Sequence, residues 1–237
     1  MFFTLKIYLH QLIPRKNTES GKLLTNMYNI INDGQYKGQD FFNFATTSYL
    51  PRHRWYHLKE GFSAILVEEA IKQKTDLSHH HQLNILEPFC GTGTTPLTAA
   101  LQRHNSTAIE VNPFLAFTAK VKTAAGIWDK KEYEHILGKV ISISSRGAHS
   151  PLEQFSTFTE RENLTKWLFN KSILRRFTSL MNAIKKHAGF YGDALELAAI
   201  VAMYQCCNAK RDGKALRYKA DWKELDYSSD DFIREFL

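Results

Sequence analysis

The chain has 237 residues, 43% of them hydrophobic, and a formal net charge of +7 with an isoelectric point near 9.2. This length and hydrophobicity allow one substantial core or two modest ones and exclude a mainly disordered protein. Three cysteines, two of them adjacent at Cys206 and Cys207, exclude a disulfide framework and fit the reducing cytoplasm. The basic excess favours an anionic partner, and a nucleic acid is the first candidate.

The first 50 residues carry many aromatic side chains without a regular period, which predicts an N-terminal extension of short helices and loops. Residues 1–14 are apolar but too short to span a bilayer, and they lack the small-residue cleavage site of a signal peptide. We therefore expect no membrane partner. Apolar residues on one helical face predict a surface helix over residues 62–74.

A short apolar strand is predicted at residues 83–86, and it ends at the carboxylate of Glu87. A Gly-x-Gly turn at Gly91 and Gly93 follows, and a helix is expected over residues 94–103 because Pro96 is tolerated in a first helical turn. Glycines there allow a tight turn and close approach of a ligand to the backbone. The segment therefore predicts a ligand-binding loop.

A second strand is predicted about 20 residues later, and it ends at Glu110. The two strands and the helix between them form a βαβ unit, and another helix follows over residues 114–125. In α/β nucleoside sites, an acidic residue with this spacing holds the ribose hydroxyls. Glu110 is the candidate for that contact.

The turn lacks two features of phosphate-binding loops. A P-loop ends in Gly-Lys-Ser/Thr, whereas Thr94 and Thr95 follow Gly93 here, and a dinucleotide fingerprint needs a third glycine that this chain does not have. The remaining interpretation is a nucleoside ligand without a pyrophosphate. Glu87 is then available to an ammonium group of that ligand, and Glu110 to its ribose.

Beyond Gly126 the pattern changes to helices alone, with candidates at residues 129–143, 173–184 and 194–204. Residues 208–219 are predicted to form a strongly basic loop, and an acidic end follows at 224–235. We expect residues 127–237 to share one domain with the βαβ region of residues 51–126. The candidate nucleic-acid contacts in the basic loop are Lys210, Arg211, Lys214 and Arg217.

A family resemblance is carried by the segment Leu86-Glu87-Pro88-Phe89-Cys90-Gly91-Thr92-Gly93-Thr94-Thr95. It resembles the S-adenosylmethionine motif of the amino-methylating DNA methyltransferases, which is Asp/Glu-Pro-Phe-x-Gly-x-Gly-Thr. Residues 54–59 and 109–123 resemble neighbouring segments of that family, and residues 207–217 resemble a segment of one of its branches. The resemblance extends over residues 53–223 and is densest at 85–123.

The resemblance implies an α/β fold of the Rossmann-like class I methyltransferase type, S-adenosylmethionine as the cofactor and DNA as the partner. It implies methyl transfer to the exocyclic amine of adenine or cytosine, as in restriction-modification systems. The residues that it assigns to the cofactor are His57, Glu87, Pro88, Phe89, Gly91, Gly93, Thr94, Glu110 and Asn112.

The catalytic motif of that family, Asp/Asn/Ser-Pro-Pro-aromatic, is missing because this chain has no adjacent prolines. An exocyclic amine needs such a loop, which holds the amino hydrogens and stacks on the flipped base. Asn112-Pro113-Phe114 lacks the second proline and lies at the ribose position. No catalytic residue is assigned. We expect a truncated or split enzyme with an incomplete sheet, whose catalytic loop lies on a missing or separate polypeptide.

Two alternatives stay open: an RNA or tRNA methyltransferase, and a donor-binding remnant without catalysis. A thiolate mechanism on cytosine is not expected, because no cysteine follows a proline. No metal site is expected either, since the adjacent histidines His79, His80 and His81 cannot easily converge on one ion.

Overall fold

The computed structural model describes residues 3–7, 46–58, 60–78, 82–124, 129–187, 189–212 and 215–237. The chain divides into two compact units, Met1–Ile127 and Trp128–Leu237. The division lies next to residue 126, where the expected βαβ region ends. That residues 127–237 share one domain with this region stays a prediction.

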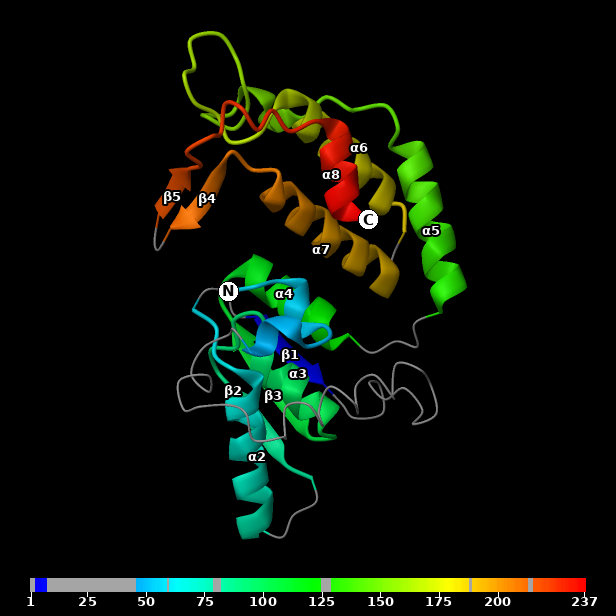
Figure 1. Cartoon of the computed structure of the whole chain (residues 1–237). Coiled ribbons are helices and arrows are strands. Elements are labelled where there is room, and N and C mark those ends of the chain that lie inside the picture. The colour runs from blue at the N-terminus through cyan, green and yellow to red at the C-terminus, as the bar shows by residue number, and fades with distance from the viewer. Residues whose placement is uncertain are drawn as a thin grey trace. The chain divides into compact units, whose positions relative to one another are not determined.

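The first unit contains a three-stranded sheet with the order β1-β3-β2. Strands β2 (Asn84–Glu87) and β3 (Asn105–Glu110) are parallel, with Glu87 opposite Ala108. Helix α3 (Thr94–Leu101) connects them (Figure 1), so the predicted βαβ unit is confirmed. Because the strands are parallel, Glu87 and Glu110 lie at the same edge of the sheet.

Strand β1 (Phe3–Ile7) pairs antiparallel with β3, with Phe3 opposite Glu110. The prediction of only helices and loops in the first 50 residues was wrong at this point. Residues 3–7 alternate apolar and polar, which is the period of a strand, but the segment is short and its partner lies about a hundred residues along the chain. Residues 8–45 lie outside the described residues.

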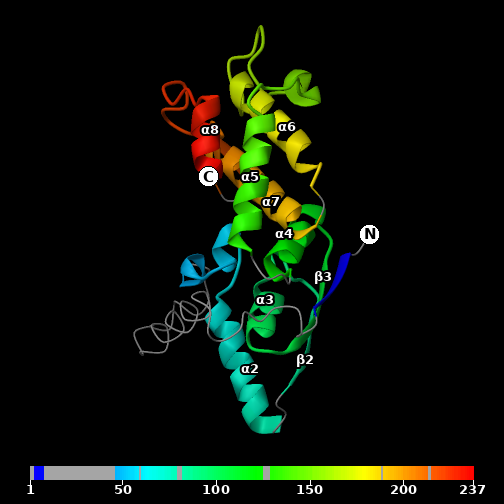
Figure 2. The same ribbon diagram turned by 90° about the vertical axis from the view of Figure 1, so that its right-hand side faces the viewer.

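Three helices accompany this sheet: α2 (Ala64–Ser78), α3 and α4 (Pro113–Thr123). Helix α2 packs on α3, and α3 packs on α4, as Figures 1 and 2 show from two sides. Two short 3-10 helices precede them at Thr46–Tyr49 and His53–Trp55. The buried apolar side chains between these elements include Val67, Ile71, Cys90, Ala99, Ala108 and Ala119. The helices predicted at 62–74, 94–103 and 114–125 are confirmed with small shifts at their ends.

The second unit is mainly helical (Figure 2). Its elements are α5 (Lys130–Ile143), a 3-10 helix (Pro151–Gln154), α6 (Lys171–Ile184), α7 (Phe190–Gln205), β4 (Ala209–Asp212), β5 (Ala215–Tyr218) and α8 (Ser229–Phe236). Helix α6, predicted at residues 173–184, forms the centre of the core together with α7 and α8. Side chains at most 1% exposed there include Ile173, Leu174, Leu180, Ile184, Leu195 and Phe232.

The prediction of helices alone beyond Gly126, with a basic loop at 208–219, was wrong. Strands β4 and β5 pair antiparallel, with Lys210 opposite Arg217, so most of the basic segment is a β-hairpin. Only Gly213 and Lys214 separate the strands in the sequence, and a two-residue connection that begins with Gly is a typical hairpin signal. The strands are only four residues long and rich in charge, so their alternation of apolar and polar residues is weak.

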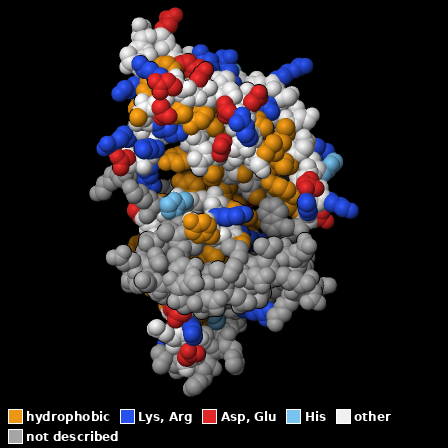
Figure 3. Space-filling model, in the orientation of Figure 1, with side chains coloured by type: hydrophobic (Ala, Val, Ile, Leu, Met, Phe, Trp, Pro, Cys, Tyr) orange, Lys and Arg blue, Asp and Glu red, His pale blue; other side chains and the backbone are white. Residues whose placement is uncertain are grey.

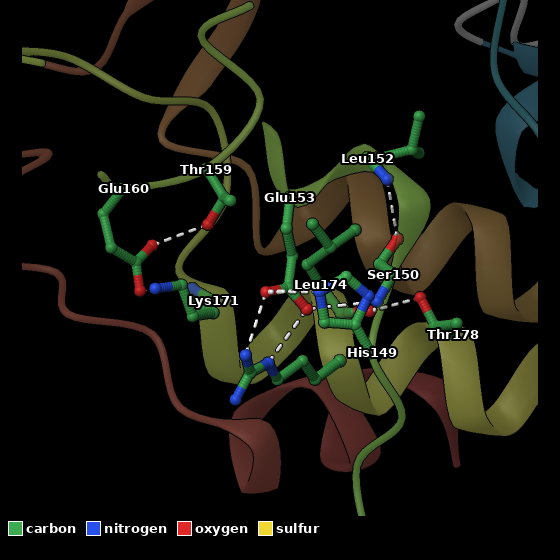
Figure 4. Close-up of polar contacts among 10 residues, drawn as sticks. His149, Ser150, Leu152, Glu153, Thr159, Glu160, Lys171, Leu174 and Thr178 are labelled. Carbon is green, nitrogen blue, oxygen red and sulfur yellow. Dashed lines mark hydrogen bonds and ion pairs between the residues drawn. The ribbon is translucent and has the colours of Figure 1, made fainter. Parts of the chain in front are cut away.

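A carboxylate holds the segment before α6 onto that helix (Figure 4). Glu153 accepts hydrogen bonds from Nε and Nη2 of Arg175, both at 2.9 Å, and from the backbone N–H of Ser150 at 3.0 Å. Arg175 lowers the pKa of Glu153 to about 2, and the Ser150 N–H contributes to the shift. Nearby, Glu160 accepts from the N–H of Lys171 at the start of α6, at 2.6 Å. These contacts fix residues 150–160 against α6.

No helix in the described part of the chain is long and apolar enough to cross a membrane.

Candidate cofactor-binding site

The glycine loop (residues 87–95) connects β2 to α3 at the edge where both parallel strands end. Gly91 has φ +52° and Gly93 has φ +86°, conformations that favour glycine. The loop is closed by a hydrogen bond from Gly93 N–H to Cys90 O at 2.8 Å, and Cys90 N–H reaches Ile109 O of β3 at 3.1 Å. The turn is therefore tied to both strands.

Gly93 has a second structural role. A Cβ atom built at this position would lie 2.9 Å from Cβ of Ala119 on α4, closer than real Cβ atoms approach. At Gly91 the nearest atom to such a Cβ is Cδ2 of Leu58, at 3.4 Å. From the sequence, a tight turn and the close approach of a ligand are the expected reasons for both glycines. The structure shows that Gly93 is also needed for the close packing of α3 against α4.

Glu110 connects the glycine loop to the end of β3. Its Oε2 accepts from Gly91 N–H at 2.9 Å, and its Oε1 accepts from the N–H groups of Val111 and Asn112 at 2.9 and 2.8 Å. A carboxylate has about four acceptor positions. About one acceptor position of Glu110 therefore remains for a ligand.

Glu87 lies beside it at the end of β2. Its Oε1 accepts from Phe89 N–H at 3.0 Å and its Oε2 from the Thr95 hydroxyl at 2.9 Å, so about two acceptor positions remain. That Thr95 is the partner of Glu87 was not predicted from the sequence. Thr95 is the second residue of α3, and the only sequence signal was its hydroxyl group at the helix start.

The N-terminus of α3 also faces this edge. Gly93 is its N-cap residue and has no side chain, so no side-chain hydrogen bond caps the helix. Uncapped N–H groups and the positive end of the helix dipole favour an anionic group at such a position. Thr94, a predicted cofactor residue, lies in this first turn and is 5% exposed.

Three large apolar side chains are exposed on the same segments. Phe89 in the loop is 84% exposed, Leu86 on β2 is 66% exposed and Val111 after β3 is 62% exposed. Pro88 is exposed as well. These side chains offer an apolar surface next to the two carboxylates.

Asn112 caps α4, since its Oδ1 accepts from the N–H groups of Phe114 and Leu115 at 2.9 and 3.2 Å. Together with Pro113 in the first turn it forms a helix start, which explains the likeness of Asn112-Pro113-Phe114 to a catalytic loop. His57 is exposed and follows Tyr56, whose ring meets that of Phe114 edge to face at 5.1 Å. His57 is thus linked to this edge through α4.

Cys90 lies within the loop and is 6% exposed. Burial raises the pKa of its thiol to about 12, and the carboxylates of Glu110 and Glu87 add to the shift. The thiol stays protonated at neutral pH and is a poor nucleophile.

The residues predicted to contact nucleic acid belong to the second unit. Lys210, Arg211 and Arg217 are exposed on the β4–β5 hairpin, and Lys214 lies outside the described residues. The histidines 79–81 also lie outside them. In the part of the chain that the structure describes, no cluster of His, Cys, Asp and Glu could hold a metal ion.

The chain is similar to the type II methyltransferase M.BsoBI of Geobacillus stearothermophilus. The two are 34% identical over 92 residues, which is 39% of this chain and 18% of that enzyme. This similarity supports a relationship to a methyltransferase, but it spans less than a fifth of the relative. No family model matches the chain. No solved structure matches it either. The first unit, with its parallel strands and covering helices, is compatible with a Rossmann-like methyltransferase fold.

Proposed function

We propose that the glycine loop binds S-adenosylmethionine and that this chain is the donor-binding part of a DNA methyltransferase. The target is an exocyclic amine, N6 of adenine or N4 of cytosine. The loop motif and the partial similarity to a type II methyltransferase support the proposal. The main observation behind this proposal is that two carboxylates at strand ends, Glu87 and Glu110, lie at the same glycine turn. Glu110 Oε2 lies 2.9 Å from Gly91 N.

Each part of the site suits one part of the donor. Glu87 has about two remaining acceptor positions and suits the ammonium group. Glu110 has about one remaining acceptor position and suits a single ribose hydroxyl. The N-terminus of α3 suits the donor's carboxylate, and the exposed ring of Phe89 suits an apolar or aromatic surface. When bound, the cofactor supplies a methyl group activated by its sulfonium.

The second half of the reaction needs groups that hold the target amine. Asn112 is not proposed for this role, because its side-chain oxygen caps α4. The chain has no adjacent prolines. We propose that the catalytic loop is contributed by residues outside these 237, in the same or in a second polypeptide.

Calorimetry with S-adenosylmethionine and its demethylated product, S-adenosylhomocysteine, tests the donor site. Glu110→Gln should weaken binding about tenfold, because the amide loses the charge and part of the acceptor capacity that hold Gly91 and the ribose. Asp76→Asn, at an exposed position on α2, is the control and should bind like the wild type.

Circular dichroism should show that both variants are folded. Absence of heat with either ligand, or equal affinity of Glu110→Gln and wild type, would contradict the donor site.

A further inference from the structure

The β4–β5 hairpin is strongly basic. Residues 208–219 contain five Lys or Arg and one acidic residue, Asp212. Lys210, Arg211 and Arg217 are all exposed, and Figure 3 shows Lys and Arg side chains gathered over this hairpin at the left edge of the view. Such a surface suits a polyanion.

The base of the hairpin is firmly held by the helical core. Asn208 N–H donates to Leu168 O at 2.7 Å, and Lys219 N–H donates to Asn208 O at 2.9 Å. Ala209 is 1% exposed, and the ring of Tyr218 lies 5.5 Å from that of Trp222. The hairpin is therefore a fixed projection, as a recognition element must be.

Not every cation of this segment is available to a partner. Lys219 donates its Nζ to Gln205 O and to the Tyr227 hydroxyl, at 3.2 and 3.1 Å. It is a structural cation. Lys210 and Arg217, in contrast, are opposite each other in the register and share one face of the ribbon.

Arg217 is oriented by an acidic neighbour. Its Nε forms an ion pair with Oδ2 of Asp212 at 2.9 Å, and the Arg217 side chain is still 75% exposed. An exposed ion pair contributes little stability. The ion pair with Asp212 does, however, fix the orientation of the planar Arg217 guanidinium through Nε. Its two terminal nitrogens, Nη1 and Nη2, can then donate in parallel to a pair of acceptors.

We infer that the β4–β5 hairpin enters the major groove of duplex DNA, where Arg217, oriented by Asp212, reads a guanine. The major groove is about 12 Å wide and admits a two-stranded ribbon, and guanine presents there the acceptor pair N7 and O6 that arginine binds bidentately. Lys210 supplies a charge for a backbone phosphate. The inference rests on the proposed DNA substrate and names the base and the residue that reads it. The hairpin does not fit the deep, narrow major groove of A-form RNA in this way.

Selection of bound duplexes from a random DNA library by the full chain tests this inference. The wild type should select a sequence with a fixed guanine, and replacing that guanine should weaken binding about tenfold or more. Arg217→Lys should lose this discrimination. Asp212→Asn should also lose it, while its affinity for unrelated duplexes rises because a negative charge is removed.

Arg234→Lys is the matched control, because Arg234 is also 75% exposed and pairs with Asp231 at 2.8 Å, but on α8. It should keep the selected sequence. The inference is overturned by a selected sequence without guanine, by unchanged selection in Arg217→Lys, or by no preference for duplex DNA over RNA. Uniform weakening of all sequences with a smaller salt dependence would show a phosphate contact and also overturn it.

Calorimetry of the same chain with S-adenosylmethionine and S-adenosylhomocysteine separates this inference from the proposed function. Guanine selection without donor binding would contradict the donor site alone. Donor binding without guanine selection would overturn the hairpin inference alone.

Discussion

Lys122 is a lysine whose side chain is 1% exposed. Its Nζ donates to Tyr56 O at 2.8 Å, which ties α4 to the segment that carries His57. Burial lowers the pKa of its amine to about 7. The neighbouring His53 is 2% exposed, and burial together with the charge of Lys122 lowers its pKa to about 3.

Lys122 should make the stability of the first unit depend on pH. Its amine has a pKa near 10.5 in the unfolded chain and about 7 in the folded chain, so between these values the unfolded chain binds more protons and stability rises with pH. Below pH 7 both states are charged and the folded state carries the full desolvation cost. Lys122→Met should therefore stabilise the unit by about 1–3 kcal/mol at pH 6, and this gain should shrink by pH 10.

Urea unfolding followed by the methyl NMR signals of Val121, which is 0% exposed on α4, measures this difference. Lys72→Met at an exposed position of α2 is the control and should show no such trend. An equal effect of Lys122→Met at pH 6 and pH 10 would rule out the buried charge as its cause.

Between elements, the contact of Glu153 with Arg175 joins the 3-10 helix Pro151–Gln154 to α6. The pKa of Glu153 is lowered from 4.5 to about 2, so its stabilising effect is complete above pH 4.5 and is lost as the pH falls toward 2. Glu153→Gln should destabilise the second unit by about 1–3 kcal/mol at pH 7. At pH 2 the variant and the wild type should be closer in stability.

Tryptophan fluorescence follows this unfolding, since Trp167 and Trp222 pack edge to face at 4.9 Å in the second unit. Glu134→Gln is the control, because Glu134 forms a longer, exposed pair with Lys130 at 3.7 Å. If Glu153→Gln and Glu134→Gln had the same small effect at pH 7, the proposed link between the elements would be wrong.

For the molecule as a whole, local patterns in the sequence predicted the βαβ unit and the helices α2 to α7, but not α8, where only an acidic end was expected. They did not predict β1, because its pairing with β3 depends on a partner about a hundred residues away. They placed Glu87 and Glu110 at strand ends. That Glu110 holds Gly91, and that Thr95 holds Glu87, follows from how the loop folds back between the strands, which no local pattern contains.

The central claim is that the glycine loop holds the methyl donor. Hydrogen exchange of the full chain with and without S-adenosylhomocysteine tests it most directly. We predict slower exchange at the Gly91, Val111 and Asn112 amides, which already bind Glu110, and no effect of ATP, since the loop lacks a P-loop lysine. Unchanged exchange at these three amides in the presence of saturating S-adenosylhomocysteine, or equal protection by ATP, would contradict the claim.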